Sequence, residues 1–490
     1  NPLLTLLKSK SGEIDPALIE PITTLVKGLN SAIEGLPDVK GIRTDIRDTI
    51  NDAAGETYSP SSLSIRSDLS DEADQLFQSL KLFVGESEEG YEGAIHELSL
   101  GGANLIYLTL KLLEFKYQKI KQSFANFLVI EEPEAHIHTH IQKTLFDRLN
   151  YSDTQVIYST HSTHISEVSN VENINILGRV KGRCEVFQPA SGLTPTEVGN
   201  IQRYLDAVRS NLLFAKSVVL VEGDAEEILI PVMVKKVLGV SLDELGVSLI
   251  NIRSTGFENV AVLFHDQRIR KRCGILTDMD TAFIVTASDP ADTEAVAKAK
   301  KKALGAQAVG VTRKAALTDF AKDNPWLEPF FAPHTFEVDF VSAGNGAKIV
   351  SVLNEIYKDA ATIALSKAEL ESGNIAEYGR RVLTMADNAG KGWFASLIGK
   401  MIDHRTTIPD YILRAIFFAQ GAISRPIVFN ILRYRLDHIA KSEGADVGGI
   451  ADFQIQLTAY RDDKLDFQGI RAVMLAAFPA DEINNILAGL

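Results

Sequence analysis

Apolar residues along the chain follow two patterns: short runs typical of strands, and mixed three- and four-residue spacings typical of helices with one buried face. The clearest strand run is Ser217–Val221, which ends in Glu222 before a glycine turn and a predicted helix. A second run spans residues 273–280 and ends in Asp278 and Asp280. Because side chains alternate along a strand, both aspartates are predicted to point the same way. The pattern therefore predicts two strands with acidic residues at their carboxyl ends.

Further elements are predicted on both sides of these strands. Residues 247–252 and 306–311 predict strands, residues 258–270 predict a helix, and residues 334–340 predict a strand that contains Glu337. Toward the C-terminus, helical spacing extends over residues 409–420, 425–442, 450–461 and 468–478. Strands that alternate with helices predict an α/β fold with a parallel sheet.

The acidic residues at the two strand ends are predicted to share one site. In a parallel α/β sheet the carboxyl ends of the strands line the ligand crevice, so Glu222, Asp278 and Asp280 are expected to converge there. Three uncompensated carboxylates repel one another unless a divalent cation lies among them. The alternative is a helix N-terminus that favours acidic residues, next to a solvated strand end.

These acidic residues also carry a family resemblance. Glu222 and Gly223, Glu226 one helical turn later, and Asp278-Met279-Asp280 resemble the Toprim domain of topoisomerases, primases and the OLD (overcoming lysogenization defect) nucleases. Thr335-Phe336-Glu337 is similar to the Thr-Leu-Glu motif of OLD nucleases, with phenylalanine in place of leucine. The segment that contains Lys391, Gly390-Lys-Gly-Trp-Phe-Ala395, resembles the family's Lys-Gly-X-Phe-Ala segment.

The Toprim resemblance implies a set of site residues. The implied ligands of one or two Mg²⁺ or Mn²⁺ ions are Glu222, Glu226, Asp278, Asp280 and Glu337. The implied catalytic residues are Glu222, Asp278, Asp280 and Lys391, the lysine stabilising charge at the scissile phosphate. The alternative for Lys391 is an ordinary loop lysine.

An earlier part of the chain resembles an ABC-type ATPase head. A Ser-X-Gly-Gly turn before a helix is similar to the signature motif, a predicted buried strand (127–130) followed by two glutamates is similar to Walker B, and the histidine after the next predicted strand (154–158) is similar to the switch histidine. The resemblance implies ATP as a ligand of the complete head and six nucleotide-site residues: Ser99, Gly101, Gly102, Glu131, Glu132 and His161. Because His136 and His140 lie four residues apart, a zinc site is the competing interpretation of the segment after Walker B.

One ATPase motif does not occur in the sequence. No Gly-x-x-x-x-Gly-Lys-[Ser/Thr] segment is present, and a head without this P-loop cannot cradle the β- and γ-phosphates of ATP. We expect that the first lobe of the head lies outside this sequence, and a degenerate head that does not hydrolyse ATP is the alternative. The sequence alone therefore leaves intrinsic ATPase activity undecided.

Composition narrows the possible partners and the compartment. A length of 490 residues suggests about three domains on the usual prior. Two cysteines exclude a disulfide framework and favour the cytoplasm, and no apolar run is long enough to cross a membrane. The net charge of −14 repels DNA, so DNA binding must depend on local basic residues and bound cations. The candidates are Arg268, Arg270, Lys271 and Arg272, which a capped helix end would explain equally well.

The order of these motifs is typical of OLD-family ATPase–Toprim endonucleases, and the layout is similar to that of the Gabija anti-phage nucleases. The predicted fold class is α/β: a helical dimerisation insert (1–95), the C-terminal lobe of an ABC-type ATPase head (96–205), a Toprim nuclease domain (206–404) and a helical region (405–490). The resemblance implies metal-dependent hydrolysis of DNA regulated by the head, a homodimer or higher homo-oligomer, and a helicase-like partner protein.

Two other functions fit parts of the sequence. One is a non-catalytic, ATP-responsive assembly scaffold whose Toprim domain is a vestigial docking module. The other is a topoisomerase or primase, which would need a catalytic tyrosine domain or a zinc ribbon, and two cysteines exclude the ribbon. Metal-dependent nicking of DNA would distinguish an enzyme from a scaffold.

Overall fold

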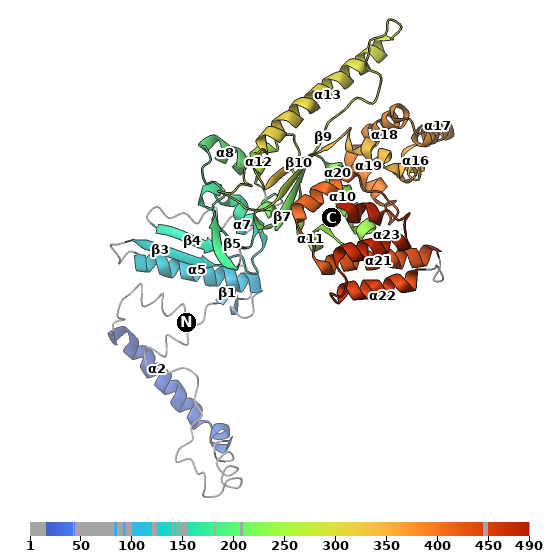
Figure 1. Cartoon of the computed structure of the whole chain (residues 1–490). Helices are drawn as coiled ribbons and strands as arrows, with labels where there is room; N and C mark the ends of the chain where they lie inside the picture. The colour runs from blue at the N-terminus through green and yellow to red at the C-terminus, as the bar shows by residue number, and fades with distance from the viewer. Residues whose placement is uncertain are drawn as a thin grey trace. The chain divides into compact units, whose positions relative to one another are not determined.

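The computed structural model describes residues 16–42, 44, 83–85, 92–94, 100–119, 125–139, 142, 143, 146, 154–180, 182–205, 209–443 and 449–489 (Figure 1). The chain divides into two compact units, Asn1–Val168 and Ser169–Leu490. Most of the predicted helical insert, residues 1–95, lies outside the described residues. The bounds of the four predicted domains stay predictions. Within the described residues, no helix has the length and apolar character that a membrane crossing requires.

The first unit contains a parallel pair of strands. Its described elements are α2 (Pro16–Gly35), the antiparallel pair β1 (Phe83–Gly85) and β2 (Glu92–Ala94), α5 (Leu100–Lys119), the parallel pair β3 (Asn126–Glu131) and β4 (Thr154–Ser159), and α7 (Thr163–Val168). Burial alternates along β3, and Phe127 and Val129 are exposed. The prediction of a buried strand over these residues was therefore wrong, because only one face of β3 is covered in this structure.

A parallel four-stranded sheet organises the second unit. Its strand order is β10-β9-β7-β8, formed by β7 (Ser217–Val221), β8 (Val247–Asn251), β9 (Cys273–Asp278) and β10 (Leu327–Ala332). All five residues of β7 are buried, as expected for a central strand with helices on both faces. An antiparallel hairpin, β5 (Ile176–Val180) and β6 (Arg183–Phe187), precedes the sheet with the short helices α8 (Pro195–Tyr204) and α9 (Asn211–Phe214).

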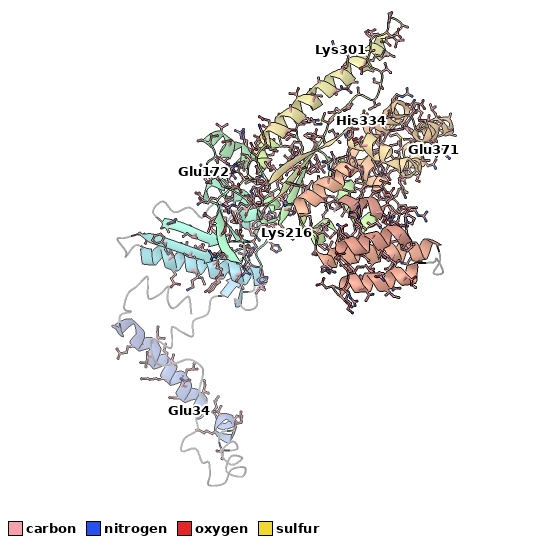
Figure 2. All side chains as sticks on the ribbon, in the orientation of Figure 1. Glu34, Glu172, Lys216, Lys301, His334 and Glu371 are labelled. Carbon is pink, nitrogen blue, oxygen red and sulfur yellow. The ribbon has the colours of Figure 1, made fainter. Side chains whose placement is uncertain are left out.

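Helices α10 (Asp224–Leu238), α11 (Leu242–Leu245), α12 (Glu258–Ala261) and α13 (Glu294–Phe320) connect the strands. Helix α13 extends away from the sheet, and Lys301 lies on its outer part (Figures 1 and 2). The neighbouring residue on this helix, Lys300, forms an ion pair with Asp292, with 2.7 Å between Nζ and Oδ2. The predicted strand over residues 306–311 was wrong, because these residues continue α13, whose alanine-rich sequence favours a helix.

A series of helices follows β10. They are α14 (Phe336–Phe340), α15 (Gly346–Val350), α16 (Leu353–Ile356), α17 (Ala360–Glu371), α18 (Ile375–Ala389), α19 (Lys391–Gly399), α20 (Asp410–Gln420), α21 (Arg425–Glu443), α22 (Ile450–Arg461), α23 (Phe467–Ala477) and α24 (Ile483–Gly489). The four helices predicted toward the C-terminus are confirmed within a residue or two at most ends as α20 to α23. The predicted strand over 334–340 was wrong, because the strand ends at Ala332 and a helix begins at Phe336.

The C-terminal helices share a hydrophobic core with the sheet. One continuous cluster of buried side chains includes Val219 of β7, Ile412 of α20 and Met474 of α23. Helix α20 packs so closely on β9 that a Cβ atom on Gly274 would lie 3.2 Å from the Ala415 carbonyl oxygen. The other face of the sheet has its own core, which includes Phe257 and Phe264. The sheet is therefore a central layer, and its carboxyl edge carries the predicted acidic residues.

Candidate active site

Glu222 lies between the end of β7 and the start of α10, and Glu226 lies in the first turn of α10. Glu222 directly follows β7, and its Oε2 atom accepts a hydrogen bond from Thr277 Oγ1 of β9 at 3.1 Å. The parallel register that pairs Leu220 with Ile275 brings these two positions side by side. Glu226 lies in the first turn of α10, and its carboxylate folds back over Gly223, where a Cβ would lie 3.0 Å from Glu226 Oε2.

The two aspartates do not continue one strand. Strand β9 ends at Asp278, which is paired with Ala332 of β10, and Asp280 has a φ of 50° in the left-handed region. The prediction that strand alternation points both side chains the same way was therefore wrong. Instead, Arg313 of α13 donates a hydrogen bond to Asp280 Oδ2 at 3.2 Å and another to the Asp278 carbonyl oxygen. A long-range contact, which local sequence patterns do not predict, sets the direction of Asp280.

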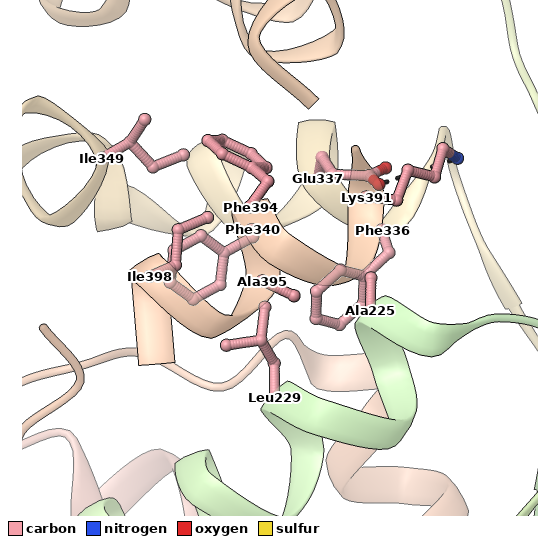
Figure 3. Close-up of a pocket in the computed structure, with 10 residues that line it drawn as sticks. All are labelled: Ala225, Leu229, Phe336, Glu337, Phe340, Ile349, Lys391, Phe394, Ala395 and Ile398. Atoms are coloured by element: carbon pink, nitrogen blue, oxygen red, sulfur yellow. Dashed lines mark ion pairs between the residues drawn. The ribbon is translucent and has the colours of Figure 1, made fainter. Parts of the chain in front are cut away.

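Glu337 and Lys391 come together from separate helices. Glu337 lies in the first turn of α14 and is only 5% exposed, while Lys391 begins α19 after Gly390, whose φ is 82°. The Lys391 Nζ atom lies 3.6 Å from Glu337 Oε1. Figure 3 shows this pair beside a small apolar pocket lined by Phe336, Phe394 and other residues, with the ammonium group turned away from the apolar side chains. The lysine thus has the buried anionic neighbour that its place at a helix N-terminus suggested.

Electrostatic interactions connect all of these residues. Burial raises the pKa of the Asp278 carboxyl group, and the negative charges of Glu226, Glu222, Glu337 and Asp280 raise it further. Burial likewise raises the pKa of Glu226 to about 7, with further contributions from Glu337 and Glu222, against the lowering effect of its own backbone N–H and Lys391. The predicted carboxylates are therefore close enough in the structure to repel one another.

The acidic group also raises the pKa of Lys391, which in a lysine favours the charged form. Burial alone would lower the pKa of its ammonium group, but Glu337, Asp278, Glu226 and Asp387 raise it. Lys391 is consequently held in its charged form at the edge of the acidic group.

Several neighbouring residues were missed by the sequence analysis. Asn251, buried at the end of β8, donates through Nδ2 to Asp224 Oδ1 at 3.0 Å and to Glu227 Oε2 at 2.7 Å. A polar residue near the end of the predicted strand over residues 247–252 was the feature of the sequence that could have indicated Asn251. Tyr411 of α20 has a buried hydroxyl that finds no hydrogen-bond partner within the described residues, and its pKa is raised by burial and then by the charge of Asp278.

Asp339 is a further buried acid next to the site. Burial raises the pKa of its carboxyl group to about 6, although the His334 backbone N–H donates to Oδ2 at 3.0 Å. His334 also contacts the Thr281 carbonyl oxygen through Nδ1 at 2.7 Å, so this loop is tied to the residues that follow Asp280. No local sequence pattern marks these contacts.

The chemistry of the donor set fits a hard divalent cation. The carboxylates that converge here, Glu222, Glu226, Asp278, Asp280 and Glu337, offer only oxygen, which is what Mg²⁺ and Mn²⁺ prefer. Their mutual repulsion would also be relieved by a positive charge between them. In the part of the chain that the structure describes, however, no three carboxylate, imidazole or thiol groups already stand in positions that could hold one ion. Binding would therefore require side-chain rotation.

Comparisons with known proteins agree with this site. The family model described as "Overcoming lysogenization defect protein-like, TOPRIM domain" matches residues 213–280, which include Glu222, Glu226, Asp278 and Asp280. The model of an AAA ATPase domain matches residues 7–166. The chain carries an OLD-like Toprim domain. The predicted resemblance to the OLD family and the α/β fold class with ATPase and Toprim domains are thereby confirmed.

Two solved structures similar to part of this chain come from OLD proteins. The C-terminal region of the Burkholderia pseudomallei OLD protein is 24% identical, covering 43% of this chain and 100% of that chain with a TM-score of 0.32. The C-terminal region of the Xanthomonas campestris pv. campestris OLD protein, phased with mercury, is 20% identical, covering 42% of this chain and 95% of that chain with a TM-score of 0.29. Because both TM-scores are low, the assignment rests on the family models. Curated proteins gave no match.

The OLD-like Toprim and ATPase domains suggest nuclease and ATPase functions, with the use of a divalent metal and a nucleotide. The matched Toprim segment ends at Asp280, so Glu337 and Lys391 lie beyond it. For those two residues the roles depend on the short motif resemblances and on the contacts described above. The closer likeness to the Gabija nucleases stays a prediction.

In the ATPase domain, two of the predicted nucleotide-site residues are close together. Glu132, with a φ of 41°, follows β3, and its Oε1 atom lies 3.6 Å from His161 Nε2. The Glu134 Oε1 atom accepts hydrogen bonds from Thr160 Oγ1 at 2.7 Å and from the His161 N–H at 2.8 Å. Parallel pairing of Glu131 with Ser159 brings these two strand ends together.

The predicted signature turn also contacts the segment after β3. Gly101 lies so close to this segment that a Cβ would be 2.3 Å from the His136 carbonyl oxygen. Gly102 is described next to it at the start of α5, while Ser99 lies outside the described residues. His136 is exposed and His140 lies outside the described residues, so the competing zinc interpretation stays an untested prediction.

The predicted DNA-binding residues all have partners within the Toprim unit. Arg268 donates to the Val262 and Ser191 carbonyl oxygens, and Lys271 donates to that of Leu213. Two further pairs complete the set: Arg270 with Glu185 at 3.1 Å, and Arg272 with the Phe418 carbonyl oxygen at 3.2 Å. The predicted helix over 258–270 was wrong, because α12 ends at Ala261. These contacts favour a structural role over phosphate binding.

Proposed function

We propose that this chain is a Mg²⁺- or Mn²⁺-dependent DNA endonuclease, in which the Toprim domain hydrolyses or nicks phosphodiester bonds and the ATPase domain regulates it. One observation carries the proposal: Glu222 lies beside the end of β9, Glu337 of α14 lies 3.6 Å from the charged Lys391, and these acids add to the raised pKa that burial gives Asp278. Such a site attracts both a cation and a phosphate, whereas a site of acids alone would repel DNA.

The residues that would hold the metal are Glu222, Glu226, Asp278, Asp280 and Glu337. A bound divalent ion would supply an activated water molecule and neutralise the leaving oxygen. The protein itself contributes the fixed position of Lys391, whose ammonium group is held 3.6 Å from Glu337 and would add positive charge to the phosphate in the transition state. Partial burial strengthens this interaction, because charges attract more strongly where water is excluded.

The regulatory part of the proposal concerns the ATPase domain. Ser99, Gly101 and Gly102 would contact a nucleotide bound by another copy of the chain, so a homodimer or higher homo-oligomer is part of the proposal. Glu131, Glu132 and His161 would instead face the nucleotide bound by their own copy, and the contact between Glu132 and His161 supports a switch that responds to the γ-phosphate. A helicase-like partner protein, a cytoplasmic location and a role in anti-phage defence follow from the layout that resembles the Gabija nucleases.

A plasmid assay tests the nuclease proposal. Supercoiled, linear and single-stranded DNA are incubated with Mg²⁺, Mn²⁺ or EDTA, and nicked and cleaved products are measured. We expect metal-dependent cleavage that Asp278→Ala abolishes without loss of the folded state, checked by circular dichroism. A matched control is Asp292→Ala, which removes an acid paired with Lys300 on α13 and should leave cleavage unchanged. Cleavage by Asp278→Ala at the wild-type rate would remove Asp278 from the site.

Nucleotide regulation has its own test. The rate of DNA cleavage is compared with and without a non-hydrolysable ATP analogue, and we expect the rate to change. Equal rates would contradict the regulatory part of the proposal and leave the nuclease part standing.

A second function is favoured by one specific observation. Within the described residues no trio of metal-binding groups is already arranged around an ion position. This fits a non-catalytic, ATP-responsive assembly scaffold with a vestigial Toprim domain. The two proposals differ in the plasmid assay, because a scaffold would give no metal-dependent product with any DNA form.

A further inference from the structure

One face of α13 contacts the segment that carries the two aspartates. Gln307, Gly310 and Arg313 are spaced three residues apart, so they lie along one side of the helix. The Gln307 Oε1 atom accepts a hydrogen bond from the Ala282 backbone N–H at 3.0 Å. The helix therefore meets this segment at three successive turns, from its Gln307 end to its Arg313 end.

Arg313 makes the strongest of these contacts. Its guanidinium group donates to Asp280 Oδ2 at 3.2 Å and to the Asp278 carbonyl oxygen, and its side chain is only 12% exposed. A buried cation is costly unless it is paired, so this geometry is maintained by the two acceptors. Because so little of Arg313 reaches the surface, it is poorly placed to bind a DNA phosphate directly.

Gly310 lets the helix approach the segment. A Cβ atom at this position would lie 2.0 Å from the Met279 carbonyl oxygen, which no side chain larger than hydrogen permits. The segment is also fixed to the end of β10, because the Met279 N–H donates to the Ala332 carbonyl oxygen at 2.8 Å. The left-handed backbone of Asp280 thus follows a residue that contacts both α13 and β10.

We infer that this face of α13 is a positioning device for the acidic site, and that Arg313 is a positioning residue that orients Asp280. The inference rests on the proposed function, because it assigns Asp280 to a metal ligand set. Arg313 occupies the Oδ2 atom of Asp280 and leaves the Oδ1 atom for a cation. Residues that orient metal ligands in this way change metal affinity typically by about 10- to 100-fold when they are removed.

Four variants test the inference. Arg313→Met removes the charge and both hydrogen bonds, Arg313→Lys keeps the charge alone, and Gly310→Ala displaces the segment without changing any charge. The matched control is Gly305→Ala on the same helix, where a Cβ would meet nothing within 4 Å. Affinity for Mn²⁺ is measured by electron paramagnetic resonance, and backbone hydrogen exchange of residues 279–282 is measured in the metal-free protein.

We expect Arg313→Met and Gly310→Ala to weaken Mn²⁺ binding about 10- to 100-fold and to speed exchange at Met279 and Ala282. Arg313→Lys should lie between wild type and Arg313→Met, and Gly305→Ala should match wild type. In the DNA cleavage assay a higher Mn²⁺ concentration should restore part of the rate of Arg313→Met, because the lost step is metal binding.

Three results would overturn the inference. One is wild-type Mn²⁺ affinity in Arg313→Met, and another is an unchanged exchange rate in both Arg313→Met and Gly310→Ala. The third is a raised KM for DNA with unchanged Mn²⁺ affinity, which would make Arg313 a substrate contact. A wild-type protein that binds no Mn²⁺ would instead remove the proposed nuclease function, and the exchange measurement would still decide whether α13 fixes the segment.

Discussion

Glu226 gives the most direct test of the electrostatics of the acidic site. Its pKa rises from the ordinary value of 4.5 to about 7, mainly because burial disfavours its charged form. The folded protein therefore holds this proton more tightly than the unfolded chain does. Protonated Glu226 consequently favours folding, so its contribution to stability is fully present below pH 4.5 and is lost as the pH rises toward 7. Above about pH 7 this group causes no further loss.

The size of the effect follows from the shift. Each pKa unit corresponds to about 1.4 kcal/mol, so a rise from 4.5 to about 7 gives at most about 3.5 kcal/mol between the two ends of the window. Asp339, with a pKa raised by burial to about 6, changes stability in the same direction at the lower end. The free energy of unfolding of the metal-free protein is therefore expected to fall as the pH increases from 5 to 8. A divalent cation should reduce this fall, because it favours the ionised carboxylates.

Urea unfolding in EDTA at pH 5, 6, 7 and 8 measures this slope, followed by tryptophan fluorescence for the wild type and for Glu226→Gln. The substitution removes the titrating group, so the pH dependence should become smaller by about 2 to 3 kcal/mol across the series. Glu244→Gln is the control. The hydrogen bonds of Ser241 lower the pKa of Glu244 to about 2, so its titration lies below the tested range and its variant should keep the full slope.

Two results would refute the reasoning. A wild-type stability that is flat or rises between pH 5 and 8 would mean that burial does not hold the proton on Glu226. A Glu226→Gln variant with the same slope as wild type would place the titrating group elsewhere. Repeating the series with Mn²⁺ separates the electrostatic argument from the metal proposal, because only the second needs the slope to shrink.

Three further predictions test other parts of the Toprim unit. Lys391→Met should lower kcat for DNA cleavage about 100-fold with little change in KM, measured by plasmid nicking, because the lost charge acts in the transition state. Gly274→Ala should lower the free energy of unfolding by about 1–3 kcal/mol in urea, because the new Cβ would lie 3.2 Å from the Ala415 carbonyl oxygen. Arg435→Met should cost about 3–5 kcal/mol in the same measurement, because it leaves Asp481 without the buried partner that Arg435 Nε provides at 2.7 Å.

Matched variants check each of these expectations. Lys391→Arg keeps the charge and should retain part of kcat, so an equal loss in both variants would point to a structural role. Gly305→Ala, in open space inside α13, should raise the free energy of unfolding by about 0.5–1 kcal/mol and not lower it, because alanine favours a helix more than glycine does. Lys235→Met breaks an exposed pair with Glu244 and should cost less than about 1 kcal/mol. An Arg435→Met loss no larger than that of Lys235→Met would contradict the buried-pair argument.

Much of the fold was predictable because it depends on local sequence. The apolar runs of β7, β8 and β9 have few alternatives to a buried strand, and the helical spacing of α20 to α23 matches their observed bounds within a few residues. The predictions were wrong where a short apolar segment is compatible with either a strand or a helix. The short apolar runs at 306–311 and 334–340 were predicted as strands, but the first continues the alanine-rich helix α13 and the second contains α14, which begins at Phe336.

The candidate site was predictable as a set of residue types and only partly as an arrangement. Acidic residues after strands, and a lysine between glycines, were visible in the sequence, and parallel pairing was enough to bring Glu222 next to Thr277, the residue before Asp278. The contacts of Arg313 and Asn251 were not visible. Each is an ordinary polar residue on a helix or at a strand end, and its role exists only because a distant segment lies against it.

The sequence by itself determined where β7, β8 and β9 lie, that carboxylates close β9 and follow β7, and that a chain of negative net charge needs cations to meet DNA. Tertiary structure decided which carboxylates face one another, that Asp280 turns toward α13 instead of continuing β9, and that Lys391 lies against Glu337. The physical reason is the different range, along the chain, over which these interactions act. Propensity and alternation act over a few residues, whereas repulsion and ion pairing depend on distances that only the packed sheet and its helices set.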